Sequence, residues 1–225
     1  MISKLLKESL RKKLIEYKNI SKKQSRILTE ATINGKTIIN VDIQPEYQSY
    51  ISFNLNQWVK FLNQSTENNN IIFLYNGQDT LGMVSESEYI DWLFNLGIDE
   101  EVIDNATFFD KGYAFFRYCM DNSIDEDAIV DLIKYMVTND INDSRDIDEE
   151  MWNDFMNTTD HSRQDVRDLL ENAGDLINIP ELMEFLQNKN NITLTGGGIN
   201  ECLKEVELAL MALDKPYSII SKFTY

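Results

Sequence analysis

The chain has very few of the residues that build disulfide-bonded or metal-stabilised proteins. Its two cysteines, Cys119 and Cys202, lie far apart in sequence and form no CxxC pair. Neither a disulfide framework nor a zinc cluster is therefore indicated. A single histidine among 225 residues argues against a histidine-based metal site. We expect reduced thiols, no bound metal and no other cofactor.

Long apolar runs are missing as well. No stretch approaches the roughly 18 to 20 apolar residues that cross a bilayer. Residues 1–30 lack the apolar core and the small-residue cleavage site of a secretory signal. These absences predict a soluble protein that stays in the cytoplasm and makes no membrane contact.

Acidic residues dominate the chain except at its start. Residues 1–36 hold ten Lys and Arg against three Glu, a net charge of +7, and residues 37–225 hold 11 basic and 35 acidic residues, a net charge of −24. The whole chain therefore carries −17. A body this acidic repels phosphate backbones, which argues against nucleic acid as a partner.

The basic segment, residues 1–36, has the pattern of an amphipathic helical arm. Lys and Arg fill most of its faces, whereas apolar side chains recur at three- and four-residue steps. These apolar residues are Ile2, Leu6, Leu10, Leu14 and Tyr17. We expect residues 3–18 to form a helix that docks on the rest of the chain or on a neighbouring copy. The arm is therefore the predicted contact for a homo-oligomer or an assembly partner.

From Thr37 onward, short β-branched or aromatic runs alternate with helical patterns, which predicts one α/β domain over residues 37–225. Such alternation is typical of a mostly parallel sheet of five or six strands in a three-layer α/β/α sandwich. Ser85 with Glu88 forms a capping-box pattern and Gly97 follows it, which predicts a helix between them. The predicted strands are residues 37–41, 71–75, 107–109, 192–195 and 217–220.

An acidic stretch, about residues 121–175, interrupts this alternation. It contains 17 acidic and four basic residues and no convincing strand. Its periodicity predicts three helices, near residues 125–138, 148–157 and 162–173. We interpret it as a helical insertion whose surface is either solvated or serves as a lid or partner surface.

Three predicted strands are followed by groups that could act together. Asp42 ends the first strand, Lys111 follows the third, and Cys202 lies in the first helical turn after the fourth. Open parallel sheets place their sites at this edge. A lysine and a helix start would favour the thiolate, the carboxylate could accept the proton, and the N–H groups of Gly197 and Gly198 could form an oxyanion hole. This is the outline of a cysteine hydrolase.

The same segments resemble the isochorismatase-like cysteine hydrolases, the superfamily that includes the nicotinamidases. The resemblance covers residues 37–120 and 178–220. An Asp-x-Gln-x-x-aromatic motif follows the first strand, a lysine precedes an aromatic-rich turn after the third, and a glycine lies six residues before the cysteine. The matching residues are Asp42, Gln44 and Tyr47, then Lys111, then Gly196 and Cys202.

The resemblance implies the site, the reaction and the strand order. It makes Asp42 the base, Lys111 the stabiliser of thiolate and substrate, and Cys202 the nucleophile. The expected reaction is metal-independent hydrolysis of a small amide, ester or vinyl ether. The strand order it implies is 3-2-1-4-5, which brings the first and fourth strands together. The residues expected to contact the substrate are Gln44, Tyr47 and Phe116.

The residues also permit readings without this chemistry. Cys202 shares its helical face with Val206 and Ala209, so it could be an inert core thiol. Asp42 could cap its loop and Lys111 could be a surface turn residue. A basic arm on an acidic domain could be an assembly device, and the Lys, Ile and Asn usage of an AT-rich genome suggests a phage or virus particle. That reading predicts a structural or interaction protein.

A second enzyme class is a metal nuclease of the PIN type. The run Val137-Thr138-Asn139-Asp140 looks like its third acidic motif, with Asp42 and either Glu46 or Asp79 as further Mg²⁺ ligands. Helical periodicity over residues 129–136 places this run at the end of a helix rather than a strand. Both this placement and the acidic body count against a nuclease.

Overall fold

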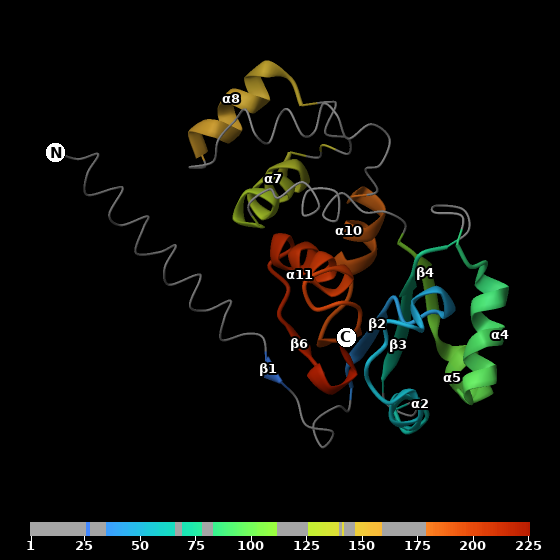
Figure 1. Ribbon diagram of the computed structural model, residues 1–225. Helices are drawn as coiled ribbons and strands as arrows, with labels where there is room; N and C mark the ends of the chain where they lie inside the picture. Colours follow the sequence, from blue (N-terminus) through green and yellow to red (C-terminus); the bar gives the residue numbers. More distant parts are fainter. Residues whose placement is uncertain are drawn as a thin grey trace.

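The strands form one parallel sheet, with the order that the resemblance implies. The computed structural model describes residues 26–27, 35–65, 69–77, 83–111, 126–139, 141, 147–158 and 179–225. The strand order is β1-β6-β5-β2-β3-β4, and every neighbouring pair is parallel (Figure 1). The strands are β1 (Arg26–Ile27), β2 (Thr37–Val41), β3 (Asn70–Tyr75), β4 (Thr107–Asp110), β5 (Ile192–Gly196) and β6 (Tyr217–Ile219). Numbered from β2, the order is 3-2-1-4-5, which confirms the prediction.

The sixth strand comes from the basic segment. β1 pairs with β6 through Arg26 opposite Ser218 and Ile27 opposite Ile219. Part of the predicted helical arm is therefore an edge strand of the sheet. The predicted helix, residues 3–18, lies outside the described residues, and its docking stays a prediction.

Helices cover both faces of the sheet, which gives the predicted α/β/α layers (Figure 1). One face carries α2 (Leu55–Asn63), α4 (Glu86–Leu96) and α5 (Glu100–Asn105), with the short helices η2 (Pro45–Tyr47) and η5 (Ser221–Phe223) on the loops. The other carries α7 (Glu126–Thr138), α10 (Ile179–Gln187) and α11 (Cys202–Ala212), and α8 (Glu149–Thr158) packs on α7. Within the described segments, none of these helices has the length and apolar character needed to cross a membrane.

The central strands β2, β3 and β5 are buried on both faces, which explains their runs of branched apolar residues. In β2, Ile39 and Val41 pack against the α11 layer, whereas Ile38 packs against the α2 layer. The predicted helix after Ser85 is α4, whose capping box of Ser85 and Glu88 is formed. It ends at Gly97, with φ +95°.

A buried polar network joins the central strands. Asn40 is fully buried in β2 and its Nδ2 donates to the Ile72 carbonyl of β3 at 3.0 Å. Its Oδ1 accepts from Trp58 Nε1 of α2 at 3.0 Å and from Thr195 Oγ1 of β5 at 3.1 Å. Because every partner is satisfied, the network fixes β2, β3 and β5 side by side. The ends of β2 and β5 carry two of the predicted site residues.

The acidic stretch contributes to the core. Two of its predicted helices are present as α7 and α8, and apolar residues of both belong to the same buried cluster as β2 and β3. Ile129, Leu132 and Ile133 are each at most 1% exposed. This part of the stretch therefore packs against α11 and extends the core on that side of the sheet, as well as carrying charge. The third predicted helix, with His161, lies outside the described residues.

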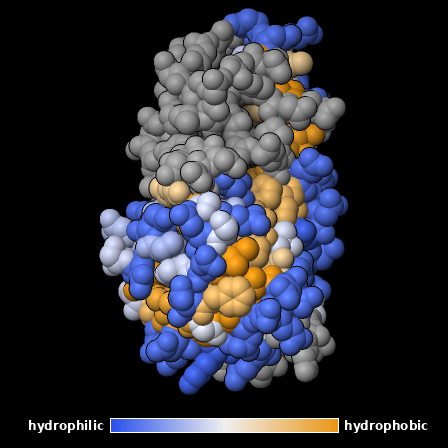
Figure 2. Space-filling view, turned by 90° about the vertical axis from the view of Figure 1, so that its right-hand side faces the viewer, coloured by the Kyte–Doolittle hydropathy of each residue, from blue (hydrophilic) through white to orange (hydrophobic). Residues whose placement is uncertain are grey.

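The face that carries α4 and α5 shows hydrophobic side chains gathered among hydrophilic ones (Figure 2). All four residues of the edge strand β4 are partly exposed, and Phe94 of α4 is 43% exposed. Asp110 is the last residue of β4, and its side chain accepts a hydrogen bond from the Gly77 N–H at 2.8 Å. A charged residue at an edge strand is a common protection against pairing with other chains.

Candidate functional site

Asp42 lies at the carboxyl end of β2, where the chain leaves the sheet. It adopts a left-handed backbone with φ +49°, a conformation that Asp tolerates better than most residues. Its N–H donates to the Leu74 carbonyl at 2.9 Å, and its carbonyl accepts from the Tyr225 hydroxyl at 3.0 Å. The residue is fully buried. These bonds hold the carboxylate at the edge of the sheet.

Lys111 enters the same space from the end of β4. Its N–H donates to the Tyr75 carbonyl at 2.9 Å, and its side chain is 3% exposed. The Nζ atom lies 3.2 Å from Asp42 Oδ2 and 2.8 Å from Glu205 Oε2. Burial alone would lower the pKa of Lys111, but the two carboxylates raise it above its usual value. Lys111 is therefore a protonated, buried cation, and the surface-turn reading is wrong.

Cys202 is the first residue of α11 and is half-buried. The turn before it is held by the Gly198 carbonyl, which accepts from the Glu201 N–H at 2.9 Å and the Leu203 N–H at 3.1 Å. Its thiol lies close enough to the Asp42 carboxylate and the Lys111 ammonium for both charges to act on its pKa. The fold thus brings Asp42, Lys111 and Cys202 together, although their catalytic roles stay predictions.

The state of the thiol corrects one expectation from the sequence. Burial raises the pKa of Cys202 well above its usual value, and the Asp42 carboxylate raises it further, while Lys111 opposes the shift. The lysine fails to produce a thiolate because it is already held between two carboxylates. Cys202 therefore rests as a neutral thiol.

Glu205 is the member of the cluster that the sequence reasoning missed. It is 1% exposed, and it binds Lys111 from a position 94 residues away in sequence. Two signals were available. Glu205 follows Cys202 by three residues, which places both on one helix face. It also lies close in sequence to the apolar residues Leu203 and Val206. This part of the helix is expected to face the core, so a charged side chain there is expected to be buried.

The glycine loop after β5 lets the backbone approach Asp42. Gly196 has φ +80° and Gly197 φ +60°. A Cβ on Gly196 would collide with the Val41 carbonyl oxygen, so only glycine fits there. Among the described residues, no backbone carbonyl accepts from the N–H of Gly198 or of Cys202. The sequence predicted an oxyanion hole from the N–H groups of Gly197 and Gly198, and that role stays a prediction.

Gln44 and Tyr47 belong to a second polar cluster beside the first. Gln44 is fully buried, and it accepts from the Asn76 N–H at 2.9 Å and donates to the Asn76 carbonyl at 3.2 Å. Asn76 Nδ2 in turn donates to the Tyr47 hydroxyl at 3.1 Å. Burial, and then the Asp42 charge, raise the pKa of Tyr47. Gln44 thus ties η2 to β3, and Tyr47 lies toward the Asp42 cluster.

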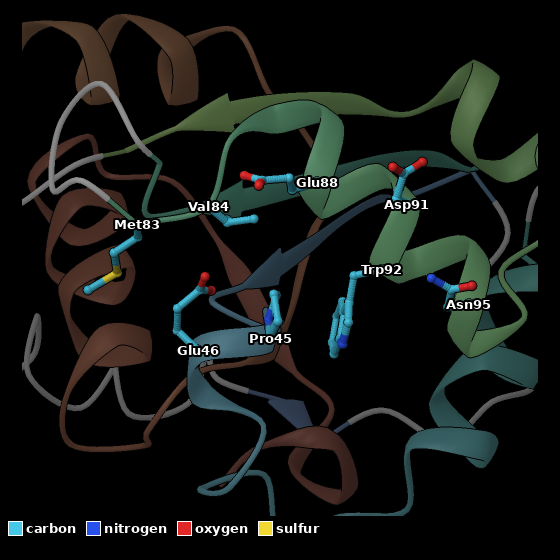
Figure 3. A pocket seen from close by; sticks show the side chains of 8 residues that line it. All are labelled: Pro45, Glu46, Met83, Val84, Glu88, Asp91, Trp92 and Asn95. Carbon is cyan, nitrogen blue, oxygen red and sulfur yellow. The ribbon is translucent and has the colours of Figure 1, made fainter.

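A shallow cavity of about 470 Å³ opens next to this second cluster (Figure 3). Met83 and Glu46 lie at one end and Trp92 and Asn95 at the other, with α4 forming one wall. Met83 Sδ accepts from the Tyr47 hydroxyl at 3.5 Å, so Tyr47 connects the cavity with the surroundings of Asp42. The lining residues are Pro45, Glu46, Met83, Val84, Glu88, Asp91, Trp92 and Asn95.

Several predicted residues cannot be placed at this site. Phe116 and Cys119 lie outside the described residues, as do Asp79 and Asp140 of the nuclease reading. The run before Asp140 ends helix α7 and is not a strand. Within the described ranges, no three His, Cys, Asp or Glu side chains are grouped to hold a metal ion.

Comparisons of the chain with protein-family models, with curated proteins and with solved structures give no match. The resemblance to the isochorismatase-like hydrolases therefore rests on the motif residues. The sheet order agrees with it, but a sheet order is shared by proteins of many functions.

Proposed function

We propose that the chain is a metal-independent cysteine hydrolase of the isochorismatase-like type, acting on a small amide, ester or vinyl ether. One observation carries the proposal. A buried lysine lies 3.2 Å from Asp42 Oδ2, and both charges act on a thiol at the start of a helix. The group lies where β2 and β5 diverge into their loops, which is the usual place for a site in an open parallel sheet.

The geometry supports a two-step reaction on an amide or ester. Asp42 takes the thiol proton while Cys202 Sγ bonds to the carbonyl carbon. The carbonyl oxygen, now negative, receives hydrogen bonds from the N–H groups of Gly198 and Cys202. The leaving group departs with the proton from Asp42. Water then attacks the thioester, with Asp42 again accepting a proton, and releases the acid and the free thiol.

Lys111 has two tasks in this scheme. Its ammonium pairs with Asp42 at 3.2 Å and so holds the proposed base in position. It also offsets negative charge on sulfur as the thiol proton leaves. The cavity beside Tyr47 is the natural space for the part of the substrate that does not react. Its aromatic side chain, Trp92, suits an apolar or cationic group.

A second candidate is a structural or interaction protein on the same fold. The observations that favour it are the raised pKa of Cys202 and the burial of Asp42, Lys111 and Glu205, each at most 2% exposed. In that case the cluster is an internal ion-pair network, and partners bind elsewhere, with residues 1–36 as the predicted contact. A phage or virus particle is the setting suggested by the composition.

Hydrolysis assays with a panel of small amides and activated esters test the proposal. Wild-type protein should turn over at least one of them, and Cys202→Ala should lower kcat/KM by about 10³-fold or more because the nucleophile is gone. Cys119→Ala, which removes the other thiol, is the matched control and should retain turnover. Equal turnover by Cys202→Ala would reject the proposal. No turnover across the panel would favour the structural candidate.

A further inference from the structure

We infer that Glu205 gives the cysteine site a negative environment, so that the site accepts uncharged or cationic substrates and excludes anions. The substrate class rests on the proposed function. The effect of Glu205 on charged reagents does not, because it follows from the arrangement of charges around the thiol.

The arrangement is one ammonium between two carboxylates. Lys111 Nζ lies 2.8 Å from Glu205 Oε2 and 3.2 Å from Asp42 Oδ2. The exposed fractions of these side chains are 3% for Lys111, 1% for Glu205 and 0% for Asp42. The Glu205 charge acts on the thiol, because it is among the causes that raise the pKa of Cys202. Water screens buried charges poorly, so the Glu205 carboxylate acts strongly on anything that approaches Cys202.

Glu205 also removes the site's means of holding an anion. Lys111 is the cation that the resemblance assigns to substrate stabilisation. An anionic substrate would have to displace one of two buried carboxylates from it, which carries a large desolvation cost. The neighbouring cavity adds the carboxylates of Glu46, Glu88 and Asp91. A substrate amide or ester that carries no acid group of its own is not repelled by these carboxylates.

Among the described residues, the acidic groups near the thiol act in one direction and Lys111 in the other. Burial raises the pKa of Cys202 most, Asp42 and Glu205 raise it further, and Lys111 lowers it. The hydroxyls of Tyr47 and Tyr225, both with raised pKa values, are neutral at neutral pH and add no charge. Removing the Glu205 charge should therefore make the thiol more acidic and the site more tolerant of anions.

Two alkylating reagents of nearly equal shape test the inference directly. Iodoacetamide is neutral and iodoacetate is an anion, and mass spectrometry reports their reaction with Cys202 separately from Cys119. The quantity measured is the ratio of the two rate constants at Cys202, divided by the same ratio in urea-unfolded protein. In the folded wild type, iodoacetamide should react faster than iodoacetate by on the order of tenfold in this normalised ratio. A single nearby negative charge repels the anionic reagent by an energy of about that size.

The variant Glu205→Gln should bring the normalised ratio to within about threefold of one. It should also move the pH profile of alkylation to lower pH. Glu207→Gln is the matched control, since Glu207 lies on the same helix and bonds the Tyr217 hydroxyl at 2.8 Å instead of Lys111. It removes the same charge and should leave the ratio as in the wild type. Glu205→Met provides a second charge-free variant, in case Glu205→Gln fails to fold.

A normalised ratio near one in the folded wild type would overturn the inference. So would an unchanged ratio in the folded charge-free variants, or an equal drop in Glu207→Gln. Alkylation needs no turnover, so these outcomes are independent of the hydrolase assays. If the protein has no hydrolase activity but still reacts more slowly with iodoacetate, the effect of the Glu205 charge is supported. In that case only the inferred substrate class is rejected.

Discussion

Replacing Lys111 with Met should lower the free energy of unfolding by about 3–5 kcal/mol, the usual cost of removing one partner from a buried ion pair. The change preserves most of the side-chain volume but leaves the carboxylates of Asp42 and Glu205 buried without the ammonium between them. Burial of unpaired charge, rather than lost packing, is the cause. Urea unfolding followed by circular dichroism measures the difference.

Lys134→Met is the control for this experiment. Lys134 also forms a short ion pair, 2.7 Å from Asp214, but both side chains are partly exposed, at 32% and 59%. Its loss should cost no more than about 1 kcal/mol. Adding Glu205→Gln to Lys111→Met should recover part of the stability, since one buried charge is removed. If the double variant is no more stable than Lys111→Met, lost packing explains the cost and the electrostatic account is wrong.

Replacing Asp42 with Asn should have opposite effects on turnover and on thiol ionisation. The proposed base is lost, so kcat on a substrate of the wild type should fall by about 10²- to 10⁴-fold. The negative charge that raises the pKa of Cys202 is lost too, while Lys111 remains. The thiol should therefore ionise at lower pH and react faster with iodoacetamide near pH 8, where only the thiolate is nucleophilic.

The combination of lower kcat and faster alkylation of Cys202 distinguishes a catalytic Asp42 from a structural one. A variant that merely loosened the fold would expose Cys202 and also lose stability in urea, so unfolding curves are measured alongside. Asp110→Asn serves as the control, because Asp110 also ends a strand but bonds the Gly77 N–H. A slower alkylation of Cys202 in Asp42→Asn would contradict the assigned electrostatics. Unchanged turnover would remove Asp42 from the mechanism.

The fold could be read from the sequence because local signals agreed with each other. Each predicted strand from residue 37 onward matches an observed strand to within one residue at either end. The central strands β2, β3 and β5 are short, mostly apolar runs buried on both faces, which distinguishes them from the amphipathic pattern of the helices. The helix start at Ser85 was predictable from a capping box, a purely local interaction. β1 was missed because two residues carry no periodic signal.

The site could be predicted only in part. Asp42, Lys111 and Cys202 follow strand ends, and a parallel sheet gathers such positions at one edge. Glu205 became visible only with its partner, since an acid on a helix is normally exposed and Lys111 lies 94 residues away. The pKa of Cys202 depends first on its burial and then on the charges of Asp42 and Lys111, all of which are set by the tertiary structure. The sequence therefore predicted the groups present but not the charge they produce together.

The central claim is that Cys202 forms a covalent intermediate with the help of Asp42, and trapping that intermediate tests it most directly. Folded protein is mixed with p-nitrophenyl acetate, quenched in acid and digested, and the peptides are weighed. The account predicts a burst of nitrophenol and an acetyl group on the peptide that contains Cys202. The acetyl group should be absent in Cys202→Ala, and in Asp42→Asn it should persist much longer, because the base that activates water is lost. An unmodified Cys202 peptide during ester turnover, or equally fast loss of the acetyl group in wild type and Asp42→Asn, would contradict it.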